Sequence, residues 1–197
     1  MCEFCHKHGE GKKWYLEAKN YADDLLSDTR RRQFITSFAA GSDELGDSLS
    51  KMERLDKLPN FVRSVLTWQA SRKMKKLHYG QVLPLEEVER IFGFVNSITR
   101  LTCICRKATL GVEARYCYGI SLAPDGGEFG KLLSTTPGIY AAGLETSLEK
   151  RTKEEALAEF RGYEKDGLCH TVWTFVAPFI GGICNCDRSD CLAMQST

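Results

Sequence analysis

Cys103-Ile104-Cys105-Arg106 and Cys184-Asn185-Cys186 are the two stretches around which this chain is organised. Each follows a run of residues typical of a β-strand, and about 80 residues separate the two. Side chains two residues apart on a strand share a face and lie ~6.6 Å apart, because the strand rises ~3.3 Å per residue. That separation is too long for a disulfide, whose Cβ atoms lie within ~4.5 Å of each other. Neighbouring strands that carry such pairs would instead bring four thiols to one metal centre.

The chain is long enough to bury a sizeable core, with 197 residues of which 43% are hydrophobic. We expect an α+β protein in two parts. Residues 1–78 form an N-terminal Cys-x-x-Cys segment with helices, and residues 79–197 form the core that carries both Cys-x-Cys pairs.

Charge and hydropathy exclude several kinds of partner. The net charge of +1 gives no indication of nucleic-acid binding. No apolar run approaches the ~18 residues of a membrane span, so no membrane partner is expected. A secretory signal is not visible, which predicts a cytoplasmic protein. Its nine cysteines would then stay reduced, and this favours metal ligation over disulfides.

The N-terminal sequence Cys2-Glu-Phe-Cys5-His6-Lys-His8 has three interpretations. It matches the attachment signature of c-type haem, although that chemistry belongs outside the cytosol. It also suits zinc, with His6 or His8 as a further ligand. We favour a pair of cluster ligands, because Cys-x-x-Cys spacing recurs in iron–sulfur proteins.

Hydrophobic periodicity predicts the remaining elements. Residues 12–38 are expected to form one long helix, and residues 60–77 a second helix that buries Phe61, Val65, Leu66 and Trp68. The core is then predicted to contain a strand at 79–83, a helix from Pro84, and strands at 100–105 and 116–122. A loop at 123–143, a helix opened by a capping box at Thr152 and a strand at 169–176 follow. This β-α-β-β-α-β order predicts a ferredoxin-like core.

Five short stretches, in order, resemble ferredoxin-like 4Fe–4S proteins of anaerobic bacteria and archaea. They begin at Leu83, Cys103, Lys153, Gly167 and Ile183, and together they span about residues 82 to 187, roughly half of the chain. The resemblance implies 4Fe–4S binding and a role in electron transfer, or as a redox accessory subunit, with a redox partner protein.

Two departures from the family pattern affect the choice of ligands. The family often has valine where Cys169 stands, which suggests a core residue and not a ligand. The C-terminal run is also sparser than the family's, so the number of clusters does not carry over. Setting Cys169 aside leaves eight cysteines, the number that two four-iron clusters require: Cys2, Cys5, Cys103, Cys105, Cys117, Cys184, Cys186 and Cys191.

How these eight divide between clusters stays open at this point. Cys2 and Cys5 would most simply pair with Cys186 and Cys191, and Cys117 has a buried strand cysteine as its alternative. Arg106, directly after a ligand, would favour the more negative reduced cluster and raise its potential. Asn185 would either donate a hydrogen bond to sulfur or serve in a turn.

Two other functions compete with electron transfer, so whether the protein is an enzyme is left open. A cluster held by only three cysteines would have an open iron that binds a small substrate. Acid–base candidates in that case are His170, Glu145 and Asp187. The protein could instead hold structural zinc.

Overall fold

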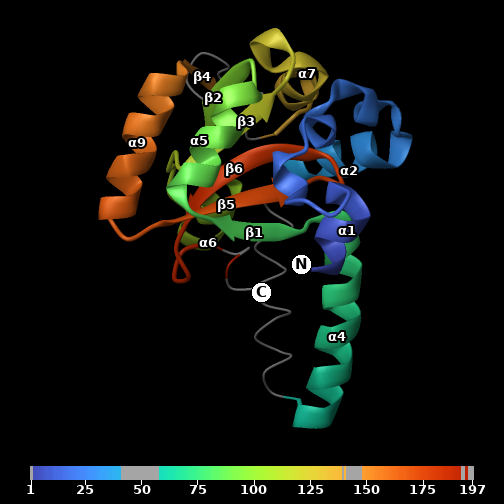
Figure 1. Cartoon of the computed structure of the whole chain (residues 1–197). Helices are drawn as coiled ribbons and strands as arrows, with labels where there is room; N and C mark the ends of the chain where they lie inside the picture. Colours follow the sequence, from blue (N-terminus) through green and yellow to red (C-terminus); the bar gives the residue numbers. More distant parts are fainter. Residues whose placement is uncertain (1, 41–57, 139, 141–147, 192–193, 195–197) are drawn as a thin grey trace.

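The computed structural model describes residues 2–40, 58–138, 140, 148–191 and 194. These residues form a mixed fold built on one antiparallel sheet of six strands in the order β1-β5-β6-β3-β2-β4, shown in Figure 1. The predicted α+β class is therefore confirmed. The strands are β1 (Gly80–Leu83), β2 (Ser97–Leu101), β3 (Cys117–Ser121), β4 (Leu148–Arg151), β5 (Cys169–Thr174) and β6 (Ile180–Cys186).

The described helices are α1 (Glu3–Gly9), α2 (Thr29–Ala40), α4 (Asn60–Leu77), α5 (Leu85–Phe94), α6 (Ile104–Leu110), α7 (Gly127–Thr135) and α9 (Lys153–Lys165). Side-chain alternation along the strands divides the core between the two faces of the sheet. One face, with Tyr118, Ile183 and Val172, packs under α5 and α9. The other face packs against α2 and α7 through residues such as Phe129 and Phe175.

The N-terminal residues contribute to both faces. Trp14 and Tyr21 are buried in the same core as α5 and α9, whereas Ile35 is buried with α7. An ion pair of 2.8 Å between Lys13 and Glu87 also ties this segment to α5. The predicted division near residue 78 therefore does not separate two hydrophobic cores.

Local sequence signals placed several elements correctly. Thr152 and Glu155 form the predicted capping box at the start of α9. Helix α5 begins after Pro84 and buries Val88, Ile91 and Phe92, as the periodicity predicts.

The single helix predicted over residues 12–38 is wrong. Three short 3₁₀ turns, at Trp14–Leu16, Ala18–Tyr21 and Asp23–Ser27, precede α2. Extended residues such as Glu17 and Ala22 separate the turns. The Asn20 side chain donates to the Trp14 carbonyl at 2.7 Å, and the Tyr21 hydroxyl donates to the Tyr15 carbonyl at 2.6 Å. These bonds satisfy the backbone without helical pairing.

The loop predicted over residues 123–143 is also wrong in part, because it contains α7. Phe129, Leu132 and Leu133 are buried on the inner side of this helix. A carboxylate oxygen of Asp23 accepts the Glu128 amide at 2.9 Å near its start.

Helix α4 has the predicted bounds but not the predicted burial. It projects away from the sheet (Figure 1), and none of its residues is buried. Phe61 is 74% exposed and Trp68 is 61% exposed, and Val65 and Leu66 are exposed as well. Among the described helices, none is long and apolar enough to cross a membrane.

The sheet contains more than the predicted four strands. The order β-α-β-β-α-β recurs in β1, α5, β2, β3, α9 and β5, but α6, α7 and β4 interrupt it. Strand β6, which the strand-like run before Cys184 indicated but which the predicted ferredoxin-like core did not include, pairs with both β5 and β3 and so lies between them. This central position of β6 determines where the cysteines meet.

Candidate metal centre

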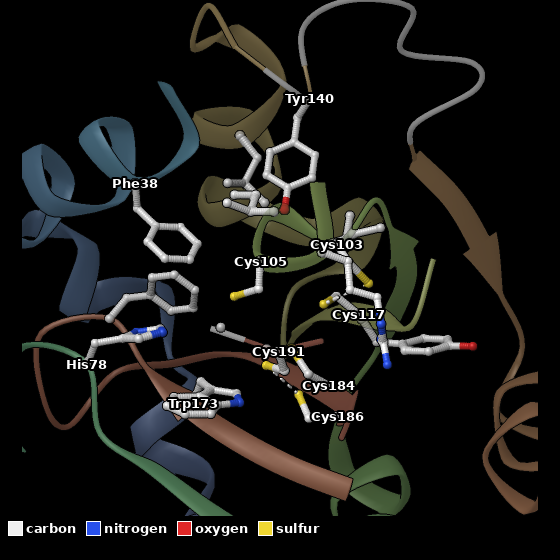
Figure 2. Close-up of a pocket in the computed structure, with 18 of the residues that line it drawn as sticks. Phe38, His78, Cys103, Cys105, Cys117, Tyr140, Trp173, Cys184, Cys186 and Cys191 are labelled. Atoms are coloured by element: carbon white, nitrogen blue, oxygen red, sulfur yellow. Dashed lines mark hydrogen bonds between the residues drawn. The ribbon is translucent and has the colours of Figure 1, made fainter. Parts of the chain in front are cut away.

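Six of the nine cysteines line one cavity of about 60 Å³ (Figure 2). The cavity lies on the face of the sheet that carries α2 and α7, and its remaining walls are largely apolar. Phe38, Trp173 and Phe175 are among these walls. The six cysteines are Cys103, Cys105, Cys117, Cys184, Cys186 and Cys191.

Three of these thiols are positioned by the centre of the sheet. Cys117 on β3 is the register partner of Cys184 on β6. Cys186 lies two residues further along β6, so its side chain is on the same face as that of Cys184. The predicted alternation of this pair is confirmed.

The other Cys-x-Cys pair reaches the cavity by a different route from the one predicted. The strand expected over residues 100–105 ends at Leu101, and Cys103 is instead the extended residue that caps α6. Its amide donates to the Ala114 carbonyl at 2.7 Å, which fixes the turn. Cys105 follows in the first turn of the helix, and both cysteines line the cavity.

Cys191 returns to the cavity through a turn after β6. A side-chain oxygen of Asp187 accepts the Asp190 amide at 2.7 Å, and the Asp187 carbonyl accepts the Cys191 amide at 3.3 Å. The Cys191 thiol then donates to the Cys186 sulfur at 3.3 Å.

Thiol contacts connect the six cysteines in one open series that runs from Cys103 to Cys105. The Cys117 thiol donates to Cys103 at 3.4 Å. Further contacts join Cys117 to Cys184, Cys184 to Cys186, and Cys191 to Cys105. The hydrogen bond with Cys191, together with burial, raises the pKa of Cys105, whereas the hydrogen bond from Cys117 lowers the pKa of Cys103 to about 7. Burial opposes the latter shift, and the Tyr116 amide and Arg106 support it.

Arg106 is buried beside these thiols and joins α6 to the end of β6. Its guanidinium donates to the Asn185 carbonyl at 3.2 Å and forms an ion pair with Asp187. It also stacks over the Tyr116 ring, 4.3 Å from the centroid. The same guanidinium lowers the pKa of Cys103, and its predicted effect on the potential of a cluster stays a prediction.

Asn185 does not donate to sulfur, so that alternative is wrong. Its side chain lies on the opposite face of β6, because it alternates with Cys184 and Cys186. The amide nitrogen donates to the Tyr116 carbonyl at 3.1 Å, and the amide oxygen lies 2.7 Å from Nδ1 of His170. His170, a former acid–base candidate, is therefore on the far side of the sheet from the cavity.

Two other groups lie within hydrogen-bond distance of sulfur and were missed from the sequence. The Tyr116 amide donates to Cys103 at 3.0 Å. The Thr171 hydroxyl lies 3.5 Å from Cys186 and 3.2 Å from the Cys184 carbonyl, either of which can accept its one proton, and the Trp173 indole donates to it at 2.8 Å. Side-chain alternation in the predicted strand over residues 169–176 places Thr171 on one face of the sheet. Only the register of this strand with β6 shows that the same face carries Cys186.

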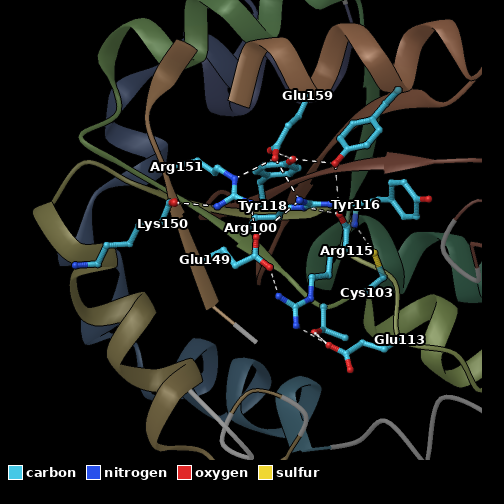
Figure 3. Close-up of polar contacts among 12 residues, drawn as sticks. Arg100, Cys103, Glu113, Arg115, Tyr116, Tyr118, Glu149, Lys150, Arg151 and Glu159 are labelled. Atoms are coloured by element: carbon cyan, nitrogen blue, oxygen red, sulfur yellow. Dashed lines mark hydrogen bonds and ion pairs between the residues drawn. The ribbon is translucent and has the colours of Figure 1, made fainter. Parts of the chain in front are cut away.

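A polar network supports the chain next to Tyr116 (Figure 3). Arg100 donates to the Arg115 carbonyl at 2.9 Å and pairs with Glu159 at 3.2 Å. Arg115 pairs in turn with Glu113 at 2.8 Å and with Glu149. The network holds the residue before Tyr116 in place without reaching the cavity itself.

The remaining three cysteines do not line the cavity. Cys2 and Cys5 lie at the start of α1, so the expected grouping with Cys186 and Cys191 is not seen. The assignment of Cys169 as a core residue is wrong, because it is exposed at the start of β5. Glu145 lies outside the described residues.

The cavity brings together six cysteine thiols, and thiolates are the usual ligands of iron–sulfur clusters. Among the described residues, no group of three or more Cys, His, Asp or Glu side chains is arranged to hold a single metal ion. A cluster does not need ligands around one point, since each thiolate binds a different iron. Four thiolates suffice for a four-iron cluster, and the cavity offers six.

No protein-family model, curated protein or solved structure matches this chain.

Proposed function

We propose that this protein binds a 4Fe–4S cluster in the six-cysteine cavity and acts in electron transfer or as a redox accessory subunit. The observation that carries the proposal is the meeting of six thiols from three separate segments in one cavity with apolar walls. When bound, such a cluster accepts and releases single electrons.

The surrounding residues suit an anionic cluster. The Tyr116 amide donates to sulfur, the Thr171 hydroxyl lies within hydrogen-bond distance of sulfur, and the Arg106 guanidinium lies beside Cys103. Hydrogen bonds to sulfur and nearby positive charge both favour the reduced state and so raise the potential. Cys105, Cys117 and Cys184 keep partial exposure, which gives a redox partner protein a route to the site.

The proposal is for one cluster in this cavity. The eight expected ligands divide into six and two, so a second cluster at Cys2 and Cys5 would need further ligands from another subunit. The relation to ferredoxin-like proteins of anaerobes stays a proposal that rests on the sequence resemblance, and the sheet departs from the predicted four-stranded core because β6 lies between β5 and β3.

The test is anaerobic purification with quantitation of iron, sulfide and zinc, and EPR of the reduced protein. We expect about four irons and four sulfides per chain. Each cavity cysteine is then changed to serine. Four of the six variants should lose the cluster, and Cys169→Ser, a cysteine outside the cavity, should retain it.

Other results would select the competing functions. Zinc without iron would show a structural zinc protein. If only three of the serine variants lost iron, the cluster would have an open iron, and the enzyme alternative would be favoured.

A further inference from the structure

Cys2 and Cys5 form a thiol pair of their own, outside the six-cysteine cavity. The Cys2 thiol donates to the Cys5 sulfur at 3.3 Å. We propose that this pair is a thiol–disulfide exchange site that reduces disulfides of peptides or small thiols. The proposal does not depend on a cluster in the cavity.

The geometry of the pair allows a disulfide to close. A disulfide bond is ~2.05 Å long, so the two sulfurs need to approach by only a little more than ~1 Å. Cys2 is the N-cap of α1, with φ −77° and ψ 159°, and its carbonyl accepts the His6 amide at 3.2 Å, so its backbone is fixed while its side chain lies outside the helix. A rotation of its exposed side chain therefore suffices, while α1 keeps its position.

The two thiols differ in access, as an exchange site requires. Cys2 is exposed, whereas Cys5 is 6% exposed and belongs to the core with Trp14 and Tyr15. A disulfide from solution can meet only the Cys2 sulfur. Cys5 can react only with the sulfur already in contact with it, so it is placed to resolve a mixed disulfide.

The exchange has two balanced steps. The Cys2 thiol first loses its proton to solvent, and the resulting thiolate attacks one sulfur of the disulfide. A Cys2–sulfur bond forms as the first substrate thiolate leaves. The Cys5 thiol then also loses its proton to solvent, and its sulfur attacks Sγ of Cys2. The second substrate thiolate leaves as the Cys2–Cys5 bond forms. The substrate gains two electrons, and the dithiol loses two.

Cys169 provides a matched control. It is exposed as Cys2 is, but the thiol–thiol hydrogen bonds found among the described residues do not include it. Its register partner Cys186 is buried, and the Cys186 sulfur accepts from the Cys191 thiol, so a mixed disulfide formed at Cys169 has no resolving thiol already in contact with it.

The test treats the intact, anaerobically purified protein with oxidised glutathione, blocks free thiols and maps peptides by mass spectrometry. In the native protein the peptide ending at Lys7 should carry an internal disulfide and no glutathione. Cys5→Ser should lose the internal disulfide and accumulate glutathione on Cys2, and Cys5→Ala repeats this if serine disturbs the core. Cys2→Ser should lose both modifications, while Cys169→Ser should behave as the native protein does.

Two results would overturn the proposal. One is stable glutathione on Cys2 in the native protein. The other is an unreactive pair whose serine variants each lose bound metal, which would make Cys2 and Cys5 ligands. A parallel reaction with insulin distinguishes the two classes of substrate. Release of the insulin chains shows that the pair reduces polypeptide disulfides as well as disulfides of small thiols.

Discussion

His78 is a partly buried titratable group at the wall of the cysteine cavity. Its ring stacks on Trp173 with centroids 4.9 Å apart, and Nδ1 lies 2.7 Å from the Thr174 carbonyl, to which it donates. Burial lowers the pKa of His78 to about 4, against smaller opposing effects of the Thr174 carbonyl and Cys191. The folded protein therefore keeps this imidazole neutral over a range in which the unfolded chain protonates it.

The pH dependence of stability follows from that difference. Between pH ~6.5 and ~4 the unfolded state binds a proton that the folded state does not, so stability falls as the pH is lowered. We expect His78 to account for a loss of up to about 2 kcal/mol in unfolding free energy between pH 7 and pH 5. Urea unfolding at the two pH values measures it, and His78→Gln should show a smaller loss. An equal loss in both proteins would contradict the assignment.

At single residues, the sequence was informative about cysteines and less so about their neighbours. The alternation of Cys184 and Cys186 follows from the period of a strand and was predictable. The group next to the Cys186 sulfur was not predictable, because Asn185 is adjacent in sequence but its side chain lies on the opposite face of β6. Thr171 faces the sulfur only through the pairing of β5 with β6. The register of the strands, which depends on the whole sheet, determines that Thr171 and not Asn185 lies next to this sulfur.

Among the secondary-structure elements, β1 depends on a glycine at its first residue. Gly80 pairs with Trp173 of β5, and a Cβ at position 80 would lie 2.4 Å from the Trp173 ring. Gly80→Ala should therefore displace a wall of the cavity and cost about 1–3 kcal/mol. In contrast, a Cβ at Gly93 in α5 meets nothing within 4 Å. Gly93→Ala should stabilise by about 0.5–1 kcal/mol. Thermal unfolding of both variants checks the pair, and equal effects would contradict it.

Helix α4 should tolerate loss of its large side chains. Phe61 and Trp68 are mostly exposed, so Phe61→Ala and Trp68→Ala should change the unfolding free energy by less than about 0.5 kcal/mol. Phe160 of α9 is fully buried, and Phe160→Ala should cost about 3–5 kcal/mol. Denaturant midpoints compare the three variants. A large loss at Trp68 would mean that α4 is covered in solution.

The elements that sequence predicted well carry strong local signals, such as the capping box of α9 and the apolar period of α5. The prediction of one helix over residues 12–38 was wrong because an interrupted apolar pattern suits both a helix and a series of 3₁₀ turns. The turns prevail because Asn20 and Tyr21 bond to the preceding backbone. For α4, the pattern gave the helix correctly, but burial depends on a neighbouring element that periodicity does not specify.

Across the whole molecule, the proposed cluster would join β3, α6 and the segment after β6. Metal ligation and folding are coupled where ligands come from separate segments. Removing iron should therefore increase amide hydrogen exchange in α6 and residues 184–191, while α5 and α9 on the other face stay protected. Hydrogen-exchange mass spectrometry of the two forms measures this. Equal loss of protection in α9 would show that the entire fold depends on the metal.

The pairing of β3 with β6 also sets the order of events during synthesis. Cys117 meets Cys184 across the sheet, and the last of the six thiols, Cys191, comes later still. Ribosomes add about 5–20 residues per second, so the roughly 80 residues after Cys105 take roughly 4–16 seconds to emerge. During that interval Cys103, Cys105 and Cys117 exist on a nascent chain that still lacks Cys184, Cys186 and Cys191. If the cavity holds the proposed cluster, iron can be enclosed only once β6 has inserted beside β3, so cluster delivery would follow translation of this segment.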